Sequence, residues 1–270
     1  MHNLKIYCMC LKNEYLESVK KHNYIPVGLK NKNFSSEWLT DDTLINISEK
    51  NPYYGEYTFY YWYWKNILKD KRKDDWIGFC SYRELWGDKK DVADKYSTKS
   101  LLKSLPEEWK DYDAIIGEPF KLKKPGVTKV LKYGKLAVLR NFKEIFKANW
   151  SIRFQFDMFH GNGYLDEAIK MLPEKDKKDF DFYVRNESSL NQGNMFVTKS
   201  SKIIHNYFSE VFSWLEKCEK IFGFDLKGYG QTRIYAYLAE RYIPFWFKKY
   251  SKCLIWPALS FNIPRKKIRN

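Results

Sequence analysis

The sequence lacks the features that would place the protein outside the cell or within a membrane. Its five cysteines form an odd set without a C-x-x-C pair, which argues against a disulfide framework or a structural zinc site. The opening residues, MHNLKIYCMC, show no charged segment followed by a long apolar run, so they do not resemble a signal peptide. No window approaches the roughly 18 apolar residues of a spanning helix. We expect a cytoplasmic protein, at most peripheral to the inner face of a membrane.

Arginine is scarce although the chain is strongly basic. Only nine of the 48 basic residues are arginine, and the net charge is +15. Lysine abundance in an Asn- and Ile-rich chain is weak evidence for nucleic-acid binding, and no RNP-like, helix-turn-helix or zinc-finger pattern is present. The charge still favours anionic partners such as nucleotides, pyrophosphates or acidic lipid head groups. A nucleic-acid-binding protein without enzymatic activity is therefore the weaker of two hypotheses.

Aromatic residues are abundant, at 19% of 270 residues, and indicate a large packed core. We find no repeat and no linker, and predict one domain over residues 1–270. The pattern favours an α/β fold, a mixed or mostly parallel sheet flanked by helices with a helical C-terminal third. The predicted strands are Leu4–Cys10, Trp76–Cys80, Ala114–Gly117 and Asn194–Thr198. The predicted helices are Phe142–Phe159, Asp166–Leu172, Ile203–Phe222 and Gln231–Ile243, with a loop at Lys121–Lys135.

The stretch Asn46–Asn66 carries nine aromatic side chains, and from Asn51 onwards it is predicted to be a buried helix. Asn51 followed by Pro52 is typical of a helix start, with Asn51 as the capping residue. Within this helix Glu56 shares a face with Tyr60. A carboxylate in apolar surroundings must be paired, hydrogen-bonded or functional. Both a core glutamate and a catalytic base fit this pattern.

The apolar run Trp76–Cys80 is predicted to be a central strand, covered on both faces. It is followed by Ser81-Tyr82-Arg83-Glu84. Ligands of open α/β sheets bind at the carboxyl ends of strands, so these residues stand where chemistry is expected. Arg83 could stabilise a leaving pyrophosphate, with Lys50, Lys65 and Arg233 as further cations.

Several motifs, in order, resemble one family: NISEKNPYYGE, a Tyr/Trp-rich helix ending WKN, WIGFCSYRE, NMF and QTRIYAYLAER. The chain resembles bacterial polysaccharide glycosyltransferases found with capsule and O-antigen genes, which include galactofuranosyltransferases and were long catalogued as an uncharacterised domain. The resemblance runs from about Lys5 to Phe247. It implies a fold related to type-A glycosyltransferases, and a hexosyltransferase, of the inverting type, that uses a nucleotide-diphosphate sugar. A UDP-linked donor, with a furanose among the candidates, and a surface polysaccharide or lipid-linked oligosaccharide acceptor are expected.

The resemblance also suggests site residues. The family reads His-Tyr-Arg-Arg after the central strand, so this chain keeps Tyr82 and Arg83 but departs at Ser81 and Glu84, which bears on donor specificity. The predicted donor-binding residues are Asn46, Lys50, Asn51, Lys65, Tyr82, Arg83 and Arg233. The residues expected to contact the acceptor are Asn194 and Gln231.

An inverting transfer needs a group that deprotonates the acceptor hydroxyl. The predicted catalytic residues are Glu56 and Asp166, with His160 as an orienting residue. A histidine at a helix end also has a purely structural explanation through the helix dipole. Glu240 and Arg241 are expected to form a structural ion pair.

We predict no metal cofactor, because no D-x-D follows the Trp76–Cys80 strand. The D-x-D at 111–113 precedes its strand, and the one at 179–181 lies in an acidic stretch. Glycosyltransferases that use Mn²⁺ or Mg²⁺ hold the metal on such carboxylates to neutralise the diphosphate. The alternative metal ligands are Asp41 and Asp42, in the loop before the aromatic helix.

Overall fold

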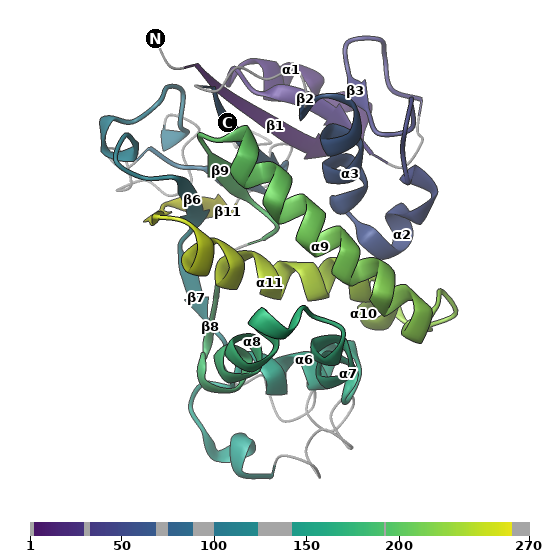
Figure 1. The fold of residues 1–270 in the computed structure, drawn as a ribbon. Helices are drawn as coiled ribbons and strands as arrows, with labels where there is room; N and C mark the ends of the chain where they lie inside the picture. The colour runs from purple at the N-terminus through teal and green to yellow at the C-terminus, as the bar shows by residue number, and fades with distance from the viewer. Residues whose placement is uncertain are drawn as a thin grey trace, which may run out of the picture. The chain divides into compact units, whose positions relative to one another are not determined.

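The computed structural model describes residues 3–29, 33–68, 75–88, 100–123, 142–191 and 193–260 (Figure 1). The chain forms two compact units. The first comprises Met1–Glu118, Gln192–Ser209 and Trp246–Asn270; the second comprises Pro119–Asn191 and Glu210–Phe245. The single-domain interpretation stays a prediction. Most of the loop expected at Lys121–Lys135 lies outside the described residues.

A mixed sheet forms the first unit. Its main strands are β1 (Leu4–Cys10), β2 (Ile25–Gly28), β3 (Leu39–Thr40), β4 (Trp76–Ser81), β6 (Ala114–Gly117), β9 (Phe196–Thr198) and β10 (Cys253–Trp256). Their order is β10-β6-β9-β4-β1-β2-β3, and β9 is antiparallel to both of its neighbours while the other pairs are parallel. β5 (Glu84–Trp86) pairs with β4 and with β11 (Ala258–Ser260). The predicted central position of Trp76–Cys80 is confirmed, because β4 lies between β1 and β9.

Aromatic side chains cover one face of this sheet. Phe79 of β4 and Phe196 of β9 have ring centres 5.0 Å apart. Tyr60, from α3 (Tyr57–Asn66), lies 4.8 Å from Phe79 and 5.7 Å from Phe208, which belongs to α9 (Ser201–Phe222). Tyr63 of α3 contacts Phe79 at 5.2 Å. Tilted and edge-on aromatic pairs at these distances add stabilisation beyond the buried area, so α3 and the start of α9 are held against the sheet.

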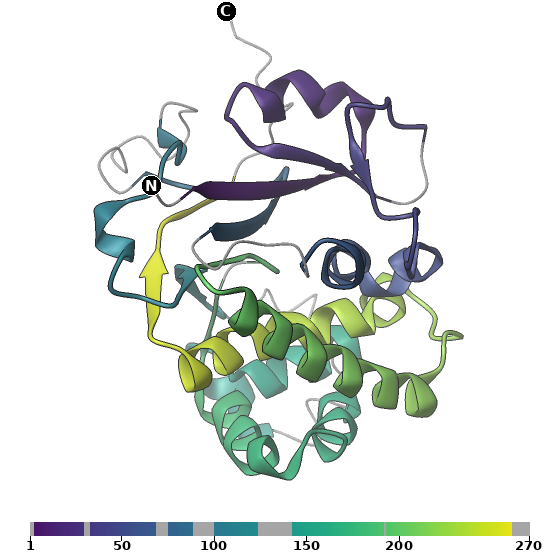
Figure 2. The same ribbon diagram turned by 45° about the horizontal axis from the view of Figure 1, so that its top comes forward.

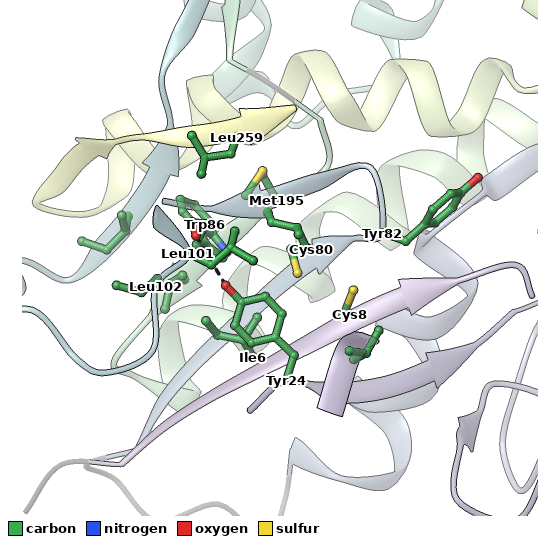
Figure 3. Packing of buried hydrophobic residues seen from close by; sticks show 14 of the residues in the cluster. Ile6, Cys8, Tyr24, Cys80, Tyr82, Trp86, Leu101, Leu102, Met195 and Leu259 are labelled. Atoms are coloured by element: carbon green, nitrogen blue, oxygen red, sulfur yellow. Dashed lines mark hydrogen bonds between the residues drawn. The ribbon is translucent and has the colours of Figure 1, made fainter. Parts of the chain in front are cut away.

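The opposite face is covered by α1 (Leu16–Lys20), the turn η6 (Glu107–Trp109) and the β5–β11 pair. Figure 2 shows α1 and α3 on opposite sides of β1. The cluster on the face covered by α1 includes Ile6, Cys8 and Cys80. Within it, the Tyr24 hydroxyl donates to the carbonyl of Trp86 at 3.4 Å (Figure 3). The cysteines of this cluster are free thiols and wholly buried, as expected for small apolar side chains.

The aromatic stretch is broken into two helices, although one was predicted. α2 (Asn51–Tyr54) ends at Gly55, whose φ of 56° only glycine adopts readily, and α3 begins after Glu56. Asn51 is not a cap, because the turn η2 (Ser48–Lys50) runs directly into α2. Its side-chain amide instead donates to the Gly55 carbonyl at 2.9 Å and to Thr58 Oγ1 at 3.0 Å. The buried Asn51 side chain therefore stabilises the turn between α2 and α3.

Helices dominate the second unit. Its elements are β7 (Pro119–Lys121), η7 (Phe142–Phe146), α6 (Ile152–His160), α7 (Tyr164–Lys170), α8 (Glu174–Asn186), β8 (Ser189–Asn191) and α10 (Tyr229–Thr232), together with parts of α9 and α11 (Ile234–Tyr250). α6 begins ten residues later than predicted, because Ser151 Oγ accepts from Phe154 N–H at 3.2 Å and caps it. Gly161, with φ 119°, follows its last residue, His160, which is one residue beyond the predicted end. No described helix is long and apolar enough to cross a bilayer.

α11 continues through Pro244, where the sequence predicted its end. Proline removes one backbone hydrogen bond, but the aromatic residues that follow it are anchored by packing. Phe245 packs on Phe180 at 5.0 Å in the second unit, and Phe247 packs on Phe196 at 4.8 Å in the first. The C-terminal third is helical as predicted, but it ends in β10 and β11, which the sequence analysis missed.

Asp41 is a buried acid at the end of β3. It is 0% exposed and lies near Thr58, which is also buried. Burial raises the pKa of Asp41 to about 6, and the charge of the adjacent Asp42 contributes to the rise. The Thr58 hydroxyl donates to the Gly55 carbonyl at 3.0 Å, and neither Asp41 oxygen has a hydrogen-bond partner among the described residues. The ionised form of Asp41 therefore destabilises the fold.

We predict that Asp41→Asn stabilises the protein more at pH 7 than at pH 4. A carboxyl whose folded pKa is raised binds its proton more tightly in the folded state. Its favourable contribution is present below the unfolded pKa and is lost as the pH rises through about 6. The difference corresponds to about 3 kcal/mol as an upper figure, since a buried amide also needs partners. Urea unfolding of the wild type and the variant at pH 4 and pH 7 measures the change in the free energy of unfolding.

Asp42→Asn is the matched control, because Asp42 is adjacent and only half-buried. It should change stability by less than about 0.5 kcal/mol at either pH. Equal effects of the two substitutions, or a gain for Asp41→Asn that does not grow with pH, would contradict the assignment.

Candidate active site

Polar residues of the first unit gather at one edge of the sheet. β1 and β4 are parallel and end together, with Met9 opposite Ser81. β9 runs the other way, with Phe196 opposite Phe79, so its first residues lie at the same edge. The residues following β4 and those preceding β9 therefore meet there, at the carboxyl ends of the parallel strands. This is the position predicted for the segment Ser81–Glu84.

Arg83 is held beside a buried tyrosine. Tyr82 is 8% exposed, its N–H donates to the Met9 carbonyl at 3.0 Å, and its ring lies 5.0 Å from that of Tyr15. Arg83 Nε donates to the Tyr82 hydroxyl at 2.9 Å, and its N–H donates to Ser81 Oγ at 3.3 Å. Arg83 itself is exposed. A guanidinium oriented in this way at the sheet edge can present a fixed fork of donors to a phosphate.

Glu84 begins β5 and lies against the loop that precedes β9. A Cβ on Gly193 would fall 1.9 Å from Glu84 Oε2, and Gly193 has a φ of 61°. Both the backbone conformation and the carboxylate therefore require glycine at this position. Glu84 occupies the position where the resembling family has a second arginine, so an acid replaces a base at this edge.

Tyr60 connects α3 to the same edge. Its hydroxyl donates to the backbone carbonyl of Asn194, whose side-chain Oδ1 is buried without a hydrogen-bond partner among the described residues. Glu56 is half-buried one helical turn before Tyr60. Burial, with a smaller contribution from the Glu56 charge, raises the pKa of Tyr60 well above its ordinary value. The Tyr60 hydroxyl therefore stays protonated and remains a hydrogen-bond donor. Glu56 is the carboxylate that α3 brings towards this edge.

The two asparagines predicted to bind the donor have local structural bonds. Asn46 Oδ1 accepts from the Ser48 N–H at 3.1 Å and from its hydroxyl at 2.9 Å, which shapes the turn before α2. Asn51 stabilises the turn after α2 through its bonds to Gly55 and Thr58. Lys50 lies beside them, with its ammonium 5.8 Å from the ring centre of Tyr54. Donor binding by these three residues stays a prediction.

Lys65 lies at the opposite end of α3 from Glu56. It follows Glu56 by nine residues, which corresponds to about 13 Å along a helix. Its ammonium lies 3.5 Å from the ring centre of Trp64, at the far end of α3. The length of the helix separates Lys65 from Glu56, and donor binding by Lys65 stays a prediction.

In the second unit, His160 is buried and held on both nitrogens. Nδ1 lies 3.0 Å from the Gly230 carbonyl, and Nε2 lies 3.2 Å from Arg241 Nη2. Arg241 can only donate, so Nε2 accepts and Nδ1 carries the hydrogen. Burial and the nearby Arg241 charge lower the pKa of His160 well below its ordinary value. The imidazole is therefore neutral, in a defined tautomer. Its orienting role in catalysis stays a prediction.

Arg241 forms the ion pair with Glu240 that the sequence predicted. It is 2% exposed and also donates to Gln155 Oε1 at 3.0 Å. Gln231 lies in α10 next to Gly230, and Arg233 follows that helix; both are half-buried. Their predicted contacts with acceptor and donor stay predictions.

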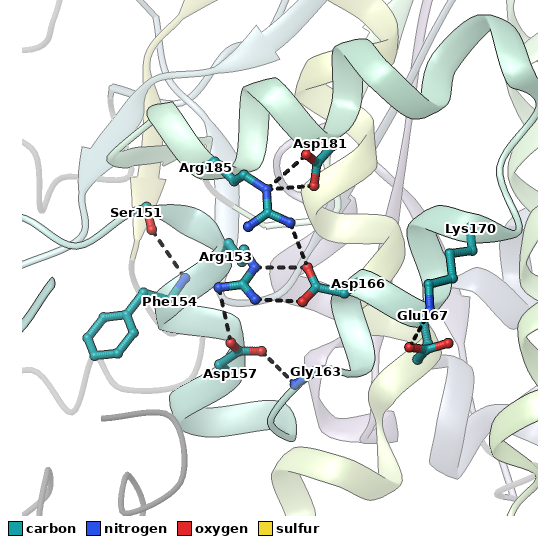
Figure 4. A network of polar contacts seen from close by, with 10 residues as sticks. All are labelled: Ser151, Arg153, Phe154, Asp157, Gly163, Asp166, Glu167, Lys170, Asp181 and Arg185. Carbon is teal, nitrogen blue, oxygen red and sulfur yellow. Dashed lines mark hydrogen bonds and ion pairs between the residues drawn. The ribbon is translucent and has the colours of Figure 1, made fainter. Parts of the chain in front are cut away.

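Asp166 is at the centre of an arginine network in the second unit (Figure 4). Arg153 donates to it through Nε at 2.8 Å and through Nη2 at 2.5 Å, and Arg185 donates at 3.2 Å. Arg153 also reaches Asp157 at 3.6 Å, and Arg185 pairs with Asp181 at 2.8 Å. These contacts join α6, α7 and α8. The position of Asp166 thus has a structural explanation, and its predicted catalytic role is untested.

The expected independence from a divalent metal stays a prediction. Among the described residues, no group of three or more His, Cys, Asp or Glu side chains is placed to hold a metal ion. Asp113 precedes β6 and accepts from Lys252 N–H at 3.0 Å, and Asp181 lies within α8. At the carboxyl end of β4, a guanidinium and a single carboxylate do not match the oxygen-rich set that Mg²⁺ or Mn²⁺ prefers. Asp41, one of the alternative ligands, is buried.

Three contributors to this edge had no predicted role: Tyr60, Glu84 and Gly193. Tyr60 was one of many aromatic residues of its helix, and Glu84 was noted only as a departure from the family pattern. The glycine was the available signal, since a glycine before the strand Asn194–Thr198 suggests a left-handed turn. The partner that such a turn approaches is distant in sequence and could not be deduced.

A solved structure described as that of WbbM, a bifunctional glycosyltransferase without ligand, has a similar fold. The TM-score is 0.64 at 19% sequence identity, and the similarity covers 95% of this chain but 45% of that one. The predicted glycosyltransferase-like α/β fold is thereby confirmed. No curated protein matches the chain. The family described as a domain of unknown function, DUF4422, matches residues 5–251. The chain therefore belongs to the DUF4422 family.

Proposed function

We propose that the protein is an inverting hexosyltransferase that moves a sugar from a UDP-linked donor, with furanoses among the candidates, to a surface polysaccharide or lipid-linked oligosaccharide. The observation that carries the proposal is Arg83, held by Tyr82 at the carboxyl end of the central strand in a glycosyltransferase-like fold. The motifs shared with capsule and O-antigen glycosyltransferases support the donor and acceptor classes. The chain spans about 45% of the length of the bifunctional relative, so the activities of that protein are not assigned to this one.

Arg83 would bind the diphosphate of the donor. As the bond from the anomeric carbon to the phosphate oxygen breaks, the electron pair and the negative charge pass to the leaving diphosphate. A guanidinium fork stabilises this charge more in the transition state than in the bound donor. The Tyr82 hydroxyl and the Ser81 side chain hold Arg83, which reduces the freedom it would otherwise lose on binding.

Glu56 is the carboxylate that we assign as general base. It would take the proton from the acceptor hydroxyl while that oxygen attacks the anomeric carbon from the face opposite the diphosphate. Of the three catalytic candidates, Glu56 is the one in the same unit as Arg83, since Asp166 and His160 belong to the second unit. Glu56 is half-buried one helical turn before Tyr60, whose hydroxyl donates to the Asn194 carbonyl at the edge where Arg83 lies. We therefore assign the role of general base to Glu56.

We expect a donor to stabilise the protein and nucleic acid to leave it unchanged. A ligand that binds only the folded state raises its apparent stability, by about 2.7 kcal/mol at a hundredfold excess over Kd. Thermal unfolding with UDP-sugars and with oligonucleotides measures both, and mass spectrometry of released nucleotide then identifies the donor. Stabilisation by oligonucleotides alone would favour the nucleic-acid-binding alternative.

Substitutions at Arg83 and Glu56 should affect different steps. Arg83→Ala should weaken donor stabilisation and lower turnover by about a hundredfold or more, because both need the phosphate contact. Glu56→Gln should preserve donor stabilisation and lower turnover by about 10²–10⁴-fold, because only proton transfer is lost. Thermal shift and turnover assays on both variants test this.

Two exposed side chains provide matched controls. Lys103→Ala removes a positive charge from the same unit, and Glu49→Gln neutralises an exposed acid close to Glu56 in the chain. Neither should change turnover more than about twofold. Wild-type turnover in Arg83→Ala, or loss of donor binding in Glu56→Gln, would refute the assigned roles.

We expect transfer to proceed without a divalent metal, because Arg83 stands where a metal-binding acid pair would be needed. A permanently charged guanidinium can neutralise the diphosphate by itself. Sugar transfer in EDTA, followed by addition of Mn²⁺ or Mg²⁺, measures the dependence. Complete loss with EDTA and recovery with metal would contradict the proposal, and would make Asp42 and the buried Asp41 the first ligands to substitute.

A further inference from the structure

A surface cavity lies at the end of α3 that is farther from Glu56. It measures about 450 Å³ and lies between the end of α3 and the beginning of α9. Its lining residues are Trp64, Lys65, Leu68, Ser201, Lys202 and His205. α9 follows β9, which is antiparallel to β4, so α9 begins at the amino ends of the parallel strands. Arg83 follows the carboxyl end of β4. The cavity is therefore at the opposite edge of the sheet from the candidate active site.

The Trp64–His205 pair organises the cavity. Trp64 Nε1–H donates to His205 Nδ1 at 3.1 Å, and the two rings meet edge to face with centres 5.9 Å apart. Because Nδ1 accepts this bond, the ring hydrogen of His205 is on Nε2, which is a donor. Lys65 stacks its ammonium on the indole of Trp64 at 3.5 Å. Two of the donors are thus oriented by the same tryptophan.

The side chains that line the cavity supply several donors, and no Asp or Glu is among these lining residues. Lys65, Lys202 and His205 carry N–H groups, and Ser201 adds a hydroxyl. Within the described part of the chain, neither lysine forms an ion pair with a carboxylate. Two unneutralised ammonium groups around one hollow create a local positive potential. The lining therefore selects for an anion.

The apolar part of the lining further restricts the class of ligand that the cavity can bind. Leu68 is buried and the Trp64 ring is half-exposed, so the cavity also offers carbon surface. A volume of about 450 Å³ is within the range of small-molecule sites and is much larger than a bare phosphate needs. Lysine ammonium groups act as point charges and bind phosphate without demanding one orientation.

We propose that this cavity binds the phosphate group of a ligand that also has an apolar or sugar portion. Such a phosphate occurs on soluble phosphorylated compounds and on anionic lipid head groups, and the chemistry of the lining serves both. The proposal does not depend on glycosyl transfer, because the cavity and Arg83 lie at opposite edges of the sheet.

The test uses the full chain with three probes: inorganic phosphate, a soluble alkyl phosphate, and phosphatidylcholine vesicles with and without phosphatidic acid. The variant is Lys65→Ala with Lys202→Ala. The control is Lys217→Ala with Lys220→Ala, which removes the same charge from exposed positions of α9 outside the cavity. Each cavity lysine should raise the affinity for alkyl phosphate about fivefold. The double variant should therefore bind alkyl phosphate about 25-fold more weakly, with little change in the control.

The probes separate the two sources of phosphate. Loss of binding to phosphatidic acid vesicles in the cavity variant alone would identify a lipid head group as the ligand. Loss for alkyl phosphate, with equal vesicle binding in both double variants, would identify a soluble ligand. Equal weakening of every probe in both variants would indicate a diffuse basic surface and overturn the proposal, as would the absence of saturable binding by the wild type. Lys202→Glu, at an exposed position, repeats the test should the double variant fail to fold.

Discussion

The packing of α3 against Phe79 is the interaction on which the first unit depends. Phe79 lies at the middle of the sheet and contacts Tyr60 and Tyr63 from one helix and Phe196 from the next strand. The opposite side of the same strand is covered by the cluster around Cys80. Burial on both faces leaves β4 no position for a polar side chain before Ser81. Chemistry is consequently confined to the residues that follow the strand.

The same packing separates the two polar sites. Along α3, which its aromatic residues hold against the sheet, Glu56 at the start lies about 13 Å from Lys65 at the end. The start of the helix approaches Asn194 through Tyr60, and the end approaches His205 through Trp64. One buried helix thus supplies polar groups to both edges of the sheet, and each edge has its own charge and its own proposed ligand.

In the second unit, buried charges act in pairs and networks. Arg241 is satisfied by Glu240, Gln155 and His160, and Asp166 by Arg153 and Arg185. A buried charge without such partners would be strongly destabilising. Asp41 is the contrasting case in the first unit, since no cation of the described residues pairs with this buried acid and its pKa rises to about 6. Its energetic cost makes it a sensitive probe of the packing around α2 and α3.

The sequence by itself determined the features that depend on neighbouring residues. The apolar runs located β1 and β4, helical periodicity located α9, and Gly161 ended α6, because each signal acts over one strand or one helical turn. Only the tertiary structure decided the contact of Glu84 with Gly193 and the continuation of α11 through Pro244. Both depend on partners far away in the chain, and a local pattern contains no information about which distant surface will bury a residue.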